Sequence, residues 1–282
     1  MRRIWRSMLY VPANVPRFVS KAPSAGADAV VLDVEDSVPA DRKAEARAAL
    51  AGAVPAARAG GSDVLVRVNR PLRVAVPDIE AAIAAGADGI LLTKVLGPEH
   101  VALAAEMLAE APRPMCVVAM AETAAAIPKL PEIARASPLL AGLLIGAEDL
   151  AAECNAAADD ETIILAKRQM IVAAHAAGIA PFGTLGTVAD YREAAKVREV
   201  VARSKRAGLL GATCIHPALV PILNEGFAPS EAELDLARRQ LAAAEAAARE
   251  GRGSFTVDGR MVDEPILIRA RRILAQAGEP PG

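Results

Sequence analysis

Short apolar runs recur along the chain and are separated by alanine-rich stretches. Runs such as AVVLD and GILLT do not alternate apolar and polar positions, which is typical of strands buried on both faces of a parallel sheet. We predict eight such strands, at residues 7–11, 29–32, 64–68, 89–93, 115–120, 142–145, 179–184 and 212–215. Their mean spacing is about 29 residues, which is the length of a βα repeat.

The intervening stretches have helical composition. Residues 41–53 and 77–85 are rich in good helix formers. A glycine follows several of these stretches shortly before the next strand, a position suited to the end of a helix, at Gly26, Gly86, Gly178 and Gly208. Eight units of this kind predict an α/β fold of the (β/α)8 TIM-barrel type. An open doubly wound sheet, which more often has five to seven strands, is the alternative.

The pattern changes after His216-Pro217. We expect a loop at residues 224–229, and then a long helix to about residue 250, because Ser230 and Glu233 have the spacing of a capping box. The glycine-rich segment GRGSFTVDGRMVDEP predicts a loop with a hairpin at Asp258-Gly259. A last helix is expected at 266–277. We therefore predict a TIM-barrel catalytic domain at 1–222 and a helix–loop–helix extension and lid at 223–282.

Composition and charge exclude several classes of function. The 282 residues are 53% hydrophobic and 23% charged, but no run of about 18 apolar residues is uninterrupted, so no membrane span is expected. A net charge of −2 and only 2% aromatic residues argue against a nucleic-acid partner. Three widely spaced cysteines without a CxxC pair predict neither a disulfide framework nor a structural zinc site. The N-terminus lacks the features of a signal peptide, so we expect a cytoplasmic protein.

Polar residues follow almost every predicted strand, and the opposite strand ends are mostly Gly and Ala. Because the active site of a βα barrel lies at the C-terminal ends of its strands, these residues are the candidates for chemistry: Asp33, Glu35, Asp36, Arg67, Asn69, Lys94, Glu122, Glu148, Asp149, Thr184, Thr187 and His216. GxGxxG after a strand and the Walker A pattern are both absent from the sequence.

Glu122 and Asp149 follow neighbouring predicted strands, so their side chains are expected to converge. Two carboxylates without a histidine favour a hard cation, Mg²⁺ or Mn²⁺, that keeps several waters and accepts an oxygen-donor substrate. The alternative is that each acid only stabilises the start of the next helix. Gly146-Ala147 lie just before these acids and let backbone N–H groups approach an anion, or form an ordinary tight turn.

Arg67 ends the apolar run VLVRV and requires a partner if buried. It pairs with Glu35 or Asp36, or binds a substrate carboxylate, and the two interpretations are compatible. Lys94 contacts a phosphate or carboxylate of a ligand, or pairs with a protein carboxylate. His216-Pro217 is expected to be structural.

Seven collinear segments resemble the citrate lyase beta subunit family and its relatives, the malyl-CoA and citramalyl-CoA lyases, within the HpcH/HpaI aldolase–citrate lyase superfamily. They are RSMLYVPANVPRF, GADAVVLDVEDSV, VRVN, AETAAAI, GAEDLA, IHP and GRMVDEP, and the similarity extends from residue 6 to about residue 275. The resemblance implies a Mg²⁺-dependent βα barrel with a C-terminal extension, commonly a homotrimer.

The resemblance also implies roles for individual residues. Glu122 and Asp149 are the implied metal ligands, Arg67 binds the carboxylate of a 2-oxo acid, and the Gly146-Ala147-Glu148 backbone lines the same pocket. Asp263 is the implied acid/base on the lid, presented to a neighbouring subunit. Arg17 and Lys21 lie where the family contacts the phosphates of CoA.

These observations predict a Mg²⁺-dependent carbon–carbon lyase that cleaves or forms a 3-hydroxyacyl-CoA thioester such as malyl-, citramalyl- or citryl-CoA, giving an acyl-CoA and a 2-oxo acid. The alternatives are a citrate lyase beta subunit acting on an acyl-carrier-protein thioester and a CoA-independent 2-oxo-acid aldolase. One departure affects the substrate: Gly183 stands roughly where many relatives carry an acid, which leaves that strand end nearly neutral.

Overall fold

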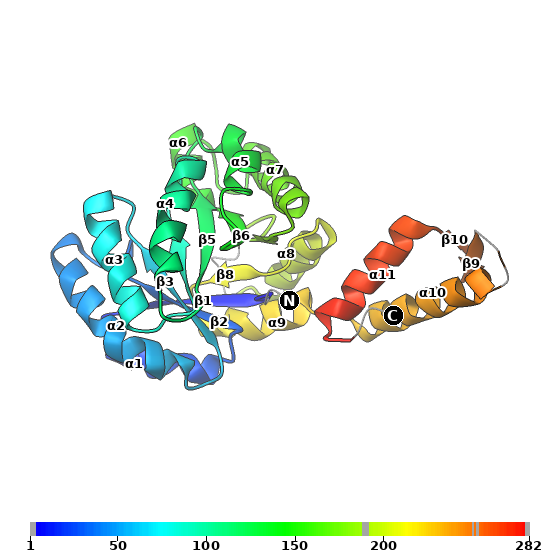
Figure 1. Ribbon diagram of the computed structural model, residues 1–282, viewed down its shortest axis with the longest axis horizontal. Coiled ribbons are helices and arrows are strands. Elements are labelled where there is room, and N and C mark those ends of the chain that lie inside the picture. The colour runs from blue at the N-terminus through cyan, green and yellow to red at the C-terminus, as the bar shows by residue number, and fades with distance from the viewer. Residues whose placement is uncertain (1–3, 188–191, 250, 252–253, 280–282) are drawn as a thin grey trace. The chain divides into compact units, whose positions relative to one another are not determined.

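The computed structural model describes residues 4–187, 192–249, 251 and 254–279 (Figure 1). It divides into two compact units, Met1–Phe227 and Ala228–Gly282. The predicted boundary after residue 222 falls inside a helix of the first unit, so the units are described below with the boundary at Phe227.

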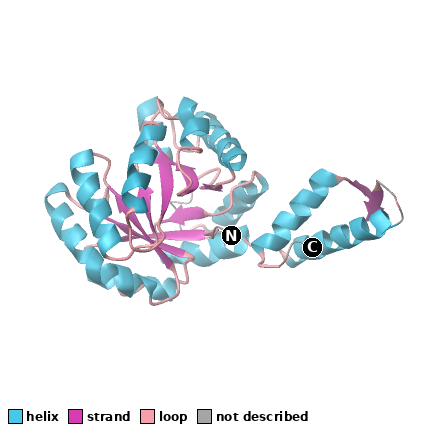
Figure 2. Cartoon of the chain, in the orientation of Figure 1, coloured by secondary structure: helices cyan, strands magenta, loops and turns pink. Residues whose placement is uncertain are grey.

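The first unit is built around one sheet of eight parallel strands (Figure 2). The strands are β1 (Ser7–Pro12), β2 (Ala29–Asp33), β3 (Asp63–Val68), β4 (Gly89–Leu92), β5 (Cys116–Ala121), β6 (Leu140–Ile145), β7 (Ala180–Phe182) and β8 (Ala212–Cys214). Their spatial order is β7-β6-β5-β4-β3-β2-β1-β8, and a parallel bridge from Phe182 to Gly211 joins the two edges. This sequential order confirms the TIM barrel and excludes the doubly wound sheet.

Helices lie outside the strands of this unit (Figures 1 and 2). They are α1 (Pro16–Val19), α2 (Lys43–Arg58), α3 (Leu72–Ala84), α4 (Pro98–Ala109), α5 (Leu130–Ile133), α6 (Ala147–Cys154), α7 (Glu161–Ala177), α8 (Ala194–Arg206) and α9 (Val220–Phe227), with short 3₁₀ turns η1 (Ala22–Ala25), η2 (Ala40–Arg42), η3 (Ile127–Lys129) and η4 (Pro217–Leu219). Within the described part of the chain, no helix is both long and apolar enough to span a bilayer.

Alternate strand residues form two separate cores. One set fills the barrel interior and includes Met8, Val31, Leu65, Val118, Met120 and Leu144. Their neighbours, such as Val30, Val66 and Val117, pack in the larger core that includes helix residues such as Leu50 and Val101. Both faces of each strand are therefore buried, which is why the runs do not alternate in polarity. The same period of two places Tyr10, Asp33, Arg67 and Glu122 next along the inner face.

Several local predictions are confirmed and one is wrong. Gly26, Gly86, Gly178 and Gly208 all have positive φ, between 68° and 101°. The loop expected at 224–229 is instead helical as far as Phe227. The reason is tertiary: Asn224 Oδ1 accepts a hydrogen bond from Ser7 Oγ at 2.6 Å, and Asn224 Nδ2 donates to the Gly26 carbonyl at 2.9 Å.

The second unit is a helical hairpin with a small two-stranded sheet. It contains α10 (Glu231–Arg249), β9 (Phe255–Val257), β10 (Arg260–Val262) and α11 (Glu264–Gln276). The capping box is confirmed, since the Glu233 N–H donates to Ser230 Oγ and the Ser230 N–H donates to Glu233 Oε2. The hairpin turn is confirmed as well, with Asp258 and Gly259 both at positive φ.

Candidate active site

Two cavities lie at the C-terminal ends of the barrel strands. The Glu122 cavity, of about 300 Å³, is lined by Glu122, Asp149 and the segment 144–148, among others. The Lys21 cavity, of about 540 Å³, is lined by Lys21, Phe18, Asp33 and His216, among others. Tyr10, Arg67 and Ile215 line both cavities. The two spaces therefore adjoin at these three residues.

Glu122 is the buried acid of this site, with a side chain held from two sides. Its residue is only 3% exposed. Glu122 Oε2 accepts a hydrogen bond from the Lys94 N–H at 2.5 Å, and Lys94 adopts the unusual left-handed φ of 49° that accompanies this contact. On the other side, a Cβ on Gly146 would lie 2.4 Å from the Glu122 side chain. Glycine is thus required at 146 for Glu122 to occupy this place.

Asp149 enters the same cavity from the first turn of α6 and is exposed. The structure brings Gly146, Ala147 and Glu148 to the cavity too, as expected. The Gly146 N–H, however, donates to the Ala121 carbonyl at 3.0 Å, so this amide is already occupied. Helix α6 begins at Ala147, and any backbone contribution to anion binding must come from its first-turn amides.

The two acids fit a divalent cation on electrostatic grounds. Burial raises the pKa of Glu122 to about 7; the Lys94 N–H opposes the rise, and the Asp149 charge adds to it. Within the described residues, no group of three or more His, Cys, Asp or Glu side chains is placed to hold a metal. Two carboxylates with open coordination positions suit Mg²⁺, which retains waters and accepts oxygens from a substrate. A cation here would relieve the cost of ionising Glu122 beside Asp149.

The raised pKa of Glu122 predicts a pH-dependent stability for the metal-free protein. An acid whose pKa rises on folding stabilises the folded state below its unfolded pKa, near 4.5, and this contribution is lost as pH rises through about 7. Between these two pH values we expect the free energy of unfolding to fall by about 3 kcal/mol. The measurement is the melting temperature in EDTA from pH 5 to 8, compared with Glu122→Gln. Parallel curves for the two proteins would contradict the prediction, whereas Mg²⁺ should restore the wild type at pH 8.

Arg67 is buried against an acid that the sequence did not single out as its partner. Its Nε donates to Asp33 Oδ1 at 2.8 Å and its Nη2 to Asp33 Oδ2 at 2.5 Å. Glu35 lies 3.3 Å from Nη1 and Asp36 only at 3.9 Å. The pairing with Glu35 is therefore present, but the bidentate partner is Asp33, the residue in register with Arg67 on the adjacent strand. The Arg67 guanidinium also stacks over Tyr10, 4.7 Å from the ring centroid.

This pair is stable because Asp33 is fully supported as an anion. Burial alone would raise the pKa of Asp33, but the hydrogen bond and charge of Arg67 outweigh it and hold the pKa below its usual value. The N–H groups of Glu35 and Ser37 also donate to the Asp33 carboxylate, at 2.8 and 3.1 Å. Arg67 is thereby fixed in orientation with its outer edge in the two cavities.

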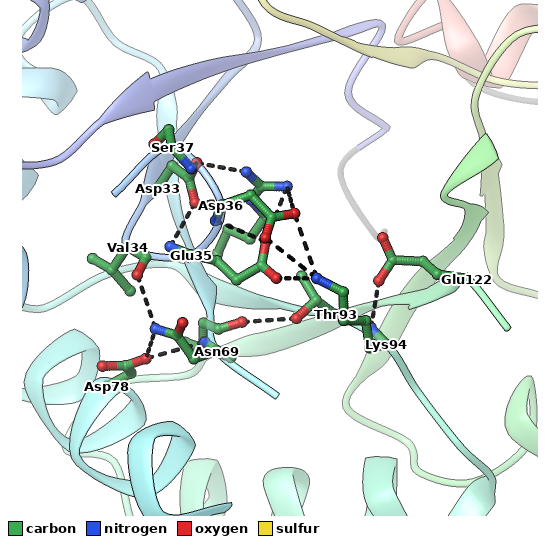
Figure 3. A network of polar contacts seen from close by, with 12 residues as sticks. Asp33, Val34, Glu35, Asp36, Ser37, Asn69, Asp78, Thr93, Lys94 and Glu122 are labelled. Carbon is green, nitrogen blue, oxygen red and sulfur yellow. Dashed lines mark hydrogen bonds and ion pairs between the residues drawn. The ribbon is translucent and has the colours of Figure 1, made fainter. Parts of the chain in front are cut away.

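Lys94 pairs with protein carboxylates, one of the two interpretations open from the sequence. Its Nζ donates to Glu35 Oε1 at 2.5 Å and lies 3.3 Å from Asp36 Oδ1. Figure 3 shows Lys94 between Glu35 and Asp36 on one side and Glu122 on the other. Burial lowers the pKa of Lys94, but the Glu35 hydrogen bond and the charges of Glu35, Asp36 and Glu122 together outweigh it and raise the pKa above its usual value. Lys94 therefore stays protonated. Its ammonium group pairs with Glu35 and Asp36, and its backbone N–H donates to Glu122.

The residues expected to contact CoA are placed unequally. Lys21 lines the Lys21 cavity, whereas Arg17 does not. The Arg17 guanidinium stacks on Phe18, 4.7 Å from its ring centroid, and Phe18 does line that cavity. His216 has a structural role, as predicted: its Nδ1 accepts from the Ala218 N–H at 3.2 Å and caps η4.

Comparison with known proteins identifies the family. Residues 6–217, most of the chain, match the family model described as HpcH/HpaI aldolase/citrate lyase. The chain is a member of the HpcH/HpaI aldolase/citrate lyase family. It is 35% identical over 276 residues to a "(3S)-malyl-CoA thioesterase" of Cereibacter sphaeroides, covering 97% of this chain and 94% of the relative. It is also 35% identical over 285 residues to the citrate lyase subunit beta of Escherichia coli, covering 98% and 94%.

Solved structures of this family show the same fold. The protein CitE from Mycobacterium tuberculosis, in complex with magnesium, acetoacetate and coenzyme A, aligns with a TM-score of 0.79 and 29% identity, covering 99% of this chain and all of that one. A citrate lyase beta subunit from M. tuberculosis, complexed with oxaloacetate and magnesium, aligns with a TM-score of 0.68 and 28% identity over 81% of this chain and 99% of the other. The chain is therefore an enzyme of a lyase family.

Asp263, the remaining candidate from the family resemblance, lies in the second unit. It is exposed and precedes the first turn of α11, where its backbone carbonyl accepts from the N–H groups of Ile266 and Leu267. The Asp263 side chain makes no capping hydrogen bond. The carboxylate is therefore not used to cap α11. The catalytic role of Asp263 stays a prediction.

Three residues of the site were missed or given no role by sequence reasoning. Tyr10 and Asp33 follow the period of two along β1 and β2, and applying that period beyond the last apolar residue would have found both. Lys167, on α7, lines the Glu122 cavity and is only 5% exposed. Its sequence surroundings carry no comparable signal, because a helical lysine is ordinarily at the surface.

Proposed function

We propose that the protein is a Mg²⁺-dependent carbon–carbon lyase that cleaves or forms a 3-hydroxyacyl-CoA thioester, giving an acyl-CoA and a 2-oxo acid. The observation that carries this proposal is the position of Arg67. It lines both the cavity that holds Glu122 and Asp149 and the larger Lys21 cavity. A small oxo acid in the first space and a thioester in the second would meet beside this arginine.

Three charged residues of the Glu122 cavity, Glu122, Asp149 and Arg67, have defined tasks in this reaction. Glu122 and Asp149 would hold the cation, which when bound supplies a Lewis acid at the oxo-acid carbonyl. Arg67 binds the oxo-acid carboxylate and orients the carbonyl, with Asp33 keeping the guanidinium in place. In cleavage the hydroxyl group loses its proton and its C–O bond becomes the carbonyl of the oxo acid, while the bond between the hydroxyl-bearing carbon and the thioester α-carbon breaks and leaves its electron pair on the α-carbon as an enolate. Asp263 is proposed to donate the proton that this carbon then takes, and to remove it in the reverse direction.

The Lys21 cavity favours a thioester substrate over a CoA-independent aldolase. A free 2-oxo acid fits within the Glu122 cavity alone, whereas a space of about 540 Å³ next to Arg67 suits the arm of a thioester. Lys21 supplies a positive charge on its wall for the phosphates of CoA. The complex of CitE with magnesium, acetoacetate and coenzyme A supports the same assignment.

Replacing Asp263 with Asn tests the proposed proton transfer. We expect kcat to fall by about 100-fold or more, the range of general acid–base catalysis, with Kd for CoA and oxo acid unchanged. Loss of exchange of the acetyl-CoA methyl protons with deuterated water is the direct readout. Asp258→Asn, in the hairpin of the same unit, is the control. Unaltered turnover in Asp263→Asn would remove it from the mechanism.

We further propose a homotrimer in which Asp263 serves the site of a neighbouring subunit. Mixing Asp263→Asn with Glu122→Gln protein would then restore activity, since some sites combine an intact Glu122 with an intact Asp263. Light scattering gives the mass of the assembly.

The experiment that tests the function is a panel of thioesters assayed with Mg²⁺. Malyl-, citramalyl- and citryl-CoA, the corresponding acyl-carrier-protein thioesters, and free malate and citrate are incubated with the enzyme. Release of glyoxylate, pyruvate or oxaloacetate without free thiol indicates a lyase. Turnover of free hydroxy acids alone would instead support the aldolase, and turnover of carrier-protein thioesters alone the citrate lyase subunit.

Thioester hydrolysis is a second candidate function. It is favoured by the 35% identity to the Cereibacter sphaeroides proteins named (3S)-malyl-CoA thioesterase. The same assay separates the two functions, because hydrolysis of malyl-CoA releases free CoA thiol and malate without an oxo acid.

A further inference from the structure

Lys167 is a buried cation in the Glu122 cavity that the mechanism above does not use. It lies on α7, a helix outside the barrel, and only 5% of the residue is exposed. It lines the cavity together with Gly183, Thr184 and Asp149. A lysine with its stem buried and its charge at a cavity wall is ordinarily retained only where something compensates the charge.

No described residue in direct contact compensates this charge. Among the described residues, Lys167 makes no hydrogen bond or ion pair, in contrast to Arg67 and Lys94 in the same region. Burial lowers the pKa of Lys167, and the charges of Glu148 and Asp159 oppose that shift. Both of these acids are exposed. The ammonium group of Lys167 therefore retains donors that no described side chain occupies.

The cavity that Lys167 lines has room for a ligand. Gly183 has a φ of +130°, a conformation that side chains rarely adopt, and a Cβ placed there would meet nothing within 4 Å. Ala158 lines the same cavity and is also small. Arg67 provides a second cation in this cavity, already fixed by Asp33. One cavity thus contains two cations, of which Lys167 has no partner among the described residues.

We propose that Lys167 is a specificity-determining residue that binds a second anionic group, a terminal carboxylate, on the 2-oxo acid. The proposal rests on the proposed function, in which Arg67 holds the carboxylate adjacent to the carbonyl. It identifies the preferred oxo acid as a dicarboxylic one. A monocarboxylic oxo acid would leave the Lys167 ammonium without a carboxylate partner, and discrimination arises because only the dicarboxylic acid gains a charge-assisted hydrogen bond to it.

Binding of two oxo acids that differ by one carboxylate tests the proposal. Dissociation constants of freshly dissolved oxaloacetate and of pyruvate are measured by titration calorimetry with Mg²⁺. The wild type is expected to prefer oxaloacetate. Lys167→Met, which keeps the apolar stem, should raise the Kd of oxaloacetate by roughly 10- to 100-fold, the range for a hydrogen bond to a charged group. Pyruvate binding should stay within about twofold of the wild type, since it does not reach Lys167.

Controls separate this role from a structural one and from failure of the proposed function. Lys167→Arg should keep the preference for oxaloacetate, and Arg168→Met, on the next position of α7, should leave both constants unchanged. Lys167→Gln is a second neutral variant if Lys167→Met does not fold. An oxaloacetate-to-pyruvate ratio that is the same in the wild type and both neutral variants overturns the role of Lys167 and leaves the lyase proposal standing. Failure of the wild type to bind either acid overturns both.

Discussion

Replacing Glu122 with Gln is expected to lower kcat by roughly a thousandfold or more. A bound metal contributes several kilocalories per mole of transition-state stabilisation, and each factor of ten in rate corresponds to about 1.4 kcal/mol. The variant should fold, because Gln has nearly the shape of Glu and removes a carboxylate that burial disfavours. The measurements are oxo-acid release from a CoA thioester and Mg²⁺ affinity by calorimetry.

The companion variant is Asp149→Asn, for which the same loss is expected because both acids line one cavity. Glu161→Gln, an exposed acid at the start of α7, is the control for a change of one charge and should behave as the wild type. EDTA-sensitive turnover retained in both Glu122→Gln and Asp149→Asn would show that the cation is held elsewhere.

Replacing Arg67 with Met should impair both binding and stability. Loss of the guanidinium removes the carboxylate contact, and we expect the KM for the oxo acid to rise by about 100-fold. It also leaves Asp33, which is 1% exposed, without its bidentate partner. Breaking a buried pair in this way costs about 3–5 kcal/mol. Steady-state kinetics and chemical denaturation measure the two effects separately.

Two further variants distinguish the effects. Arg67→Met combined with Asp33→Asn should recover much of the stability but none of the oxo-acid affinity, because the unpaired buried charge is gone and the binding group is still missing. Arg47→Met is the matched control: Arg47 pairs with Asp78, which is fully buried, and neither residue lines the two cavities. It should lower stability with an unchanged KM. An unchanged KM in Arg67→Met itself would exclude Arg67 from substrate binding.

The barrel was predictable because its strands are buried on both faces. The parallel runs are apolar throughout, and the glycines at 26, 86, 178 and 208 mark where helices end, so both signals are local. The error at 224–227 has a different origin. Asn224 has low helix propensity on its own, and only contacts with Ser7 and Gly26, about 200 residues away in sequence, account for the helix there.

The site was predictable to the extent that it follows the strand ends. Glu122, Asp149 and Arg67 are placed in one cavity by the rule that strand C-termini meet on one side of a barrel. The pairing of Arg67 with Glu35 was predicted, but its bidentate partner was not, because only the register of β2 with β3 places Asp33 opposite Arg67. Lys167 was missed because it lies on a helix, and the sequence does not show that its position faces a cavity.

The amino-acid sequence by itself determined the eight-unit barrel, the helical hairpin that follows, and the acidic and basic groups at the strand ends, because each depends on periodicity and residue type within a few turns of chain. Tertiary structure alone decided which charges are paired and which stay available. Asp33 forms an ion pair with Arg67, and Glu35 forms one with Lys94. Lys167 lies among the cavity-lining residues without a partner in the described chain. These outcomes depend on distances between residues far apart in sequence, and electrostatic energies are set by those distances and by burial.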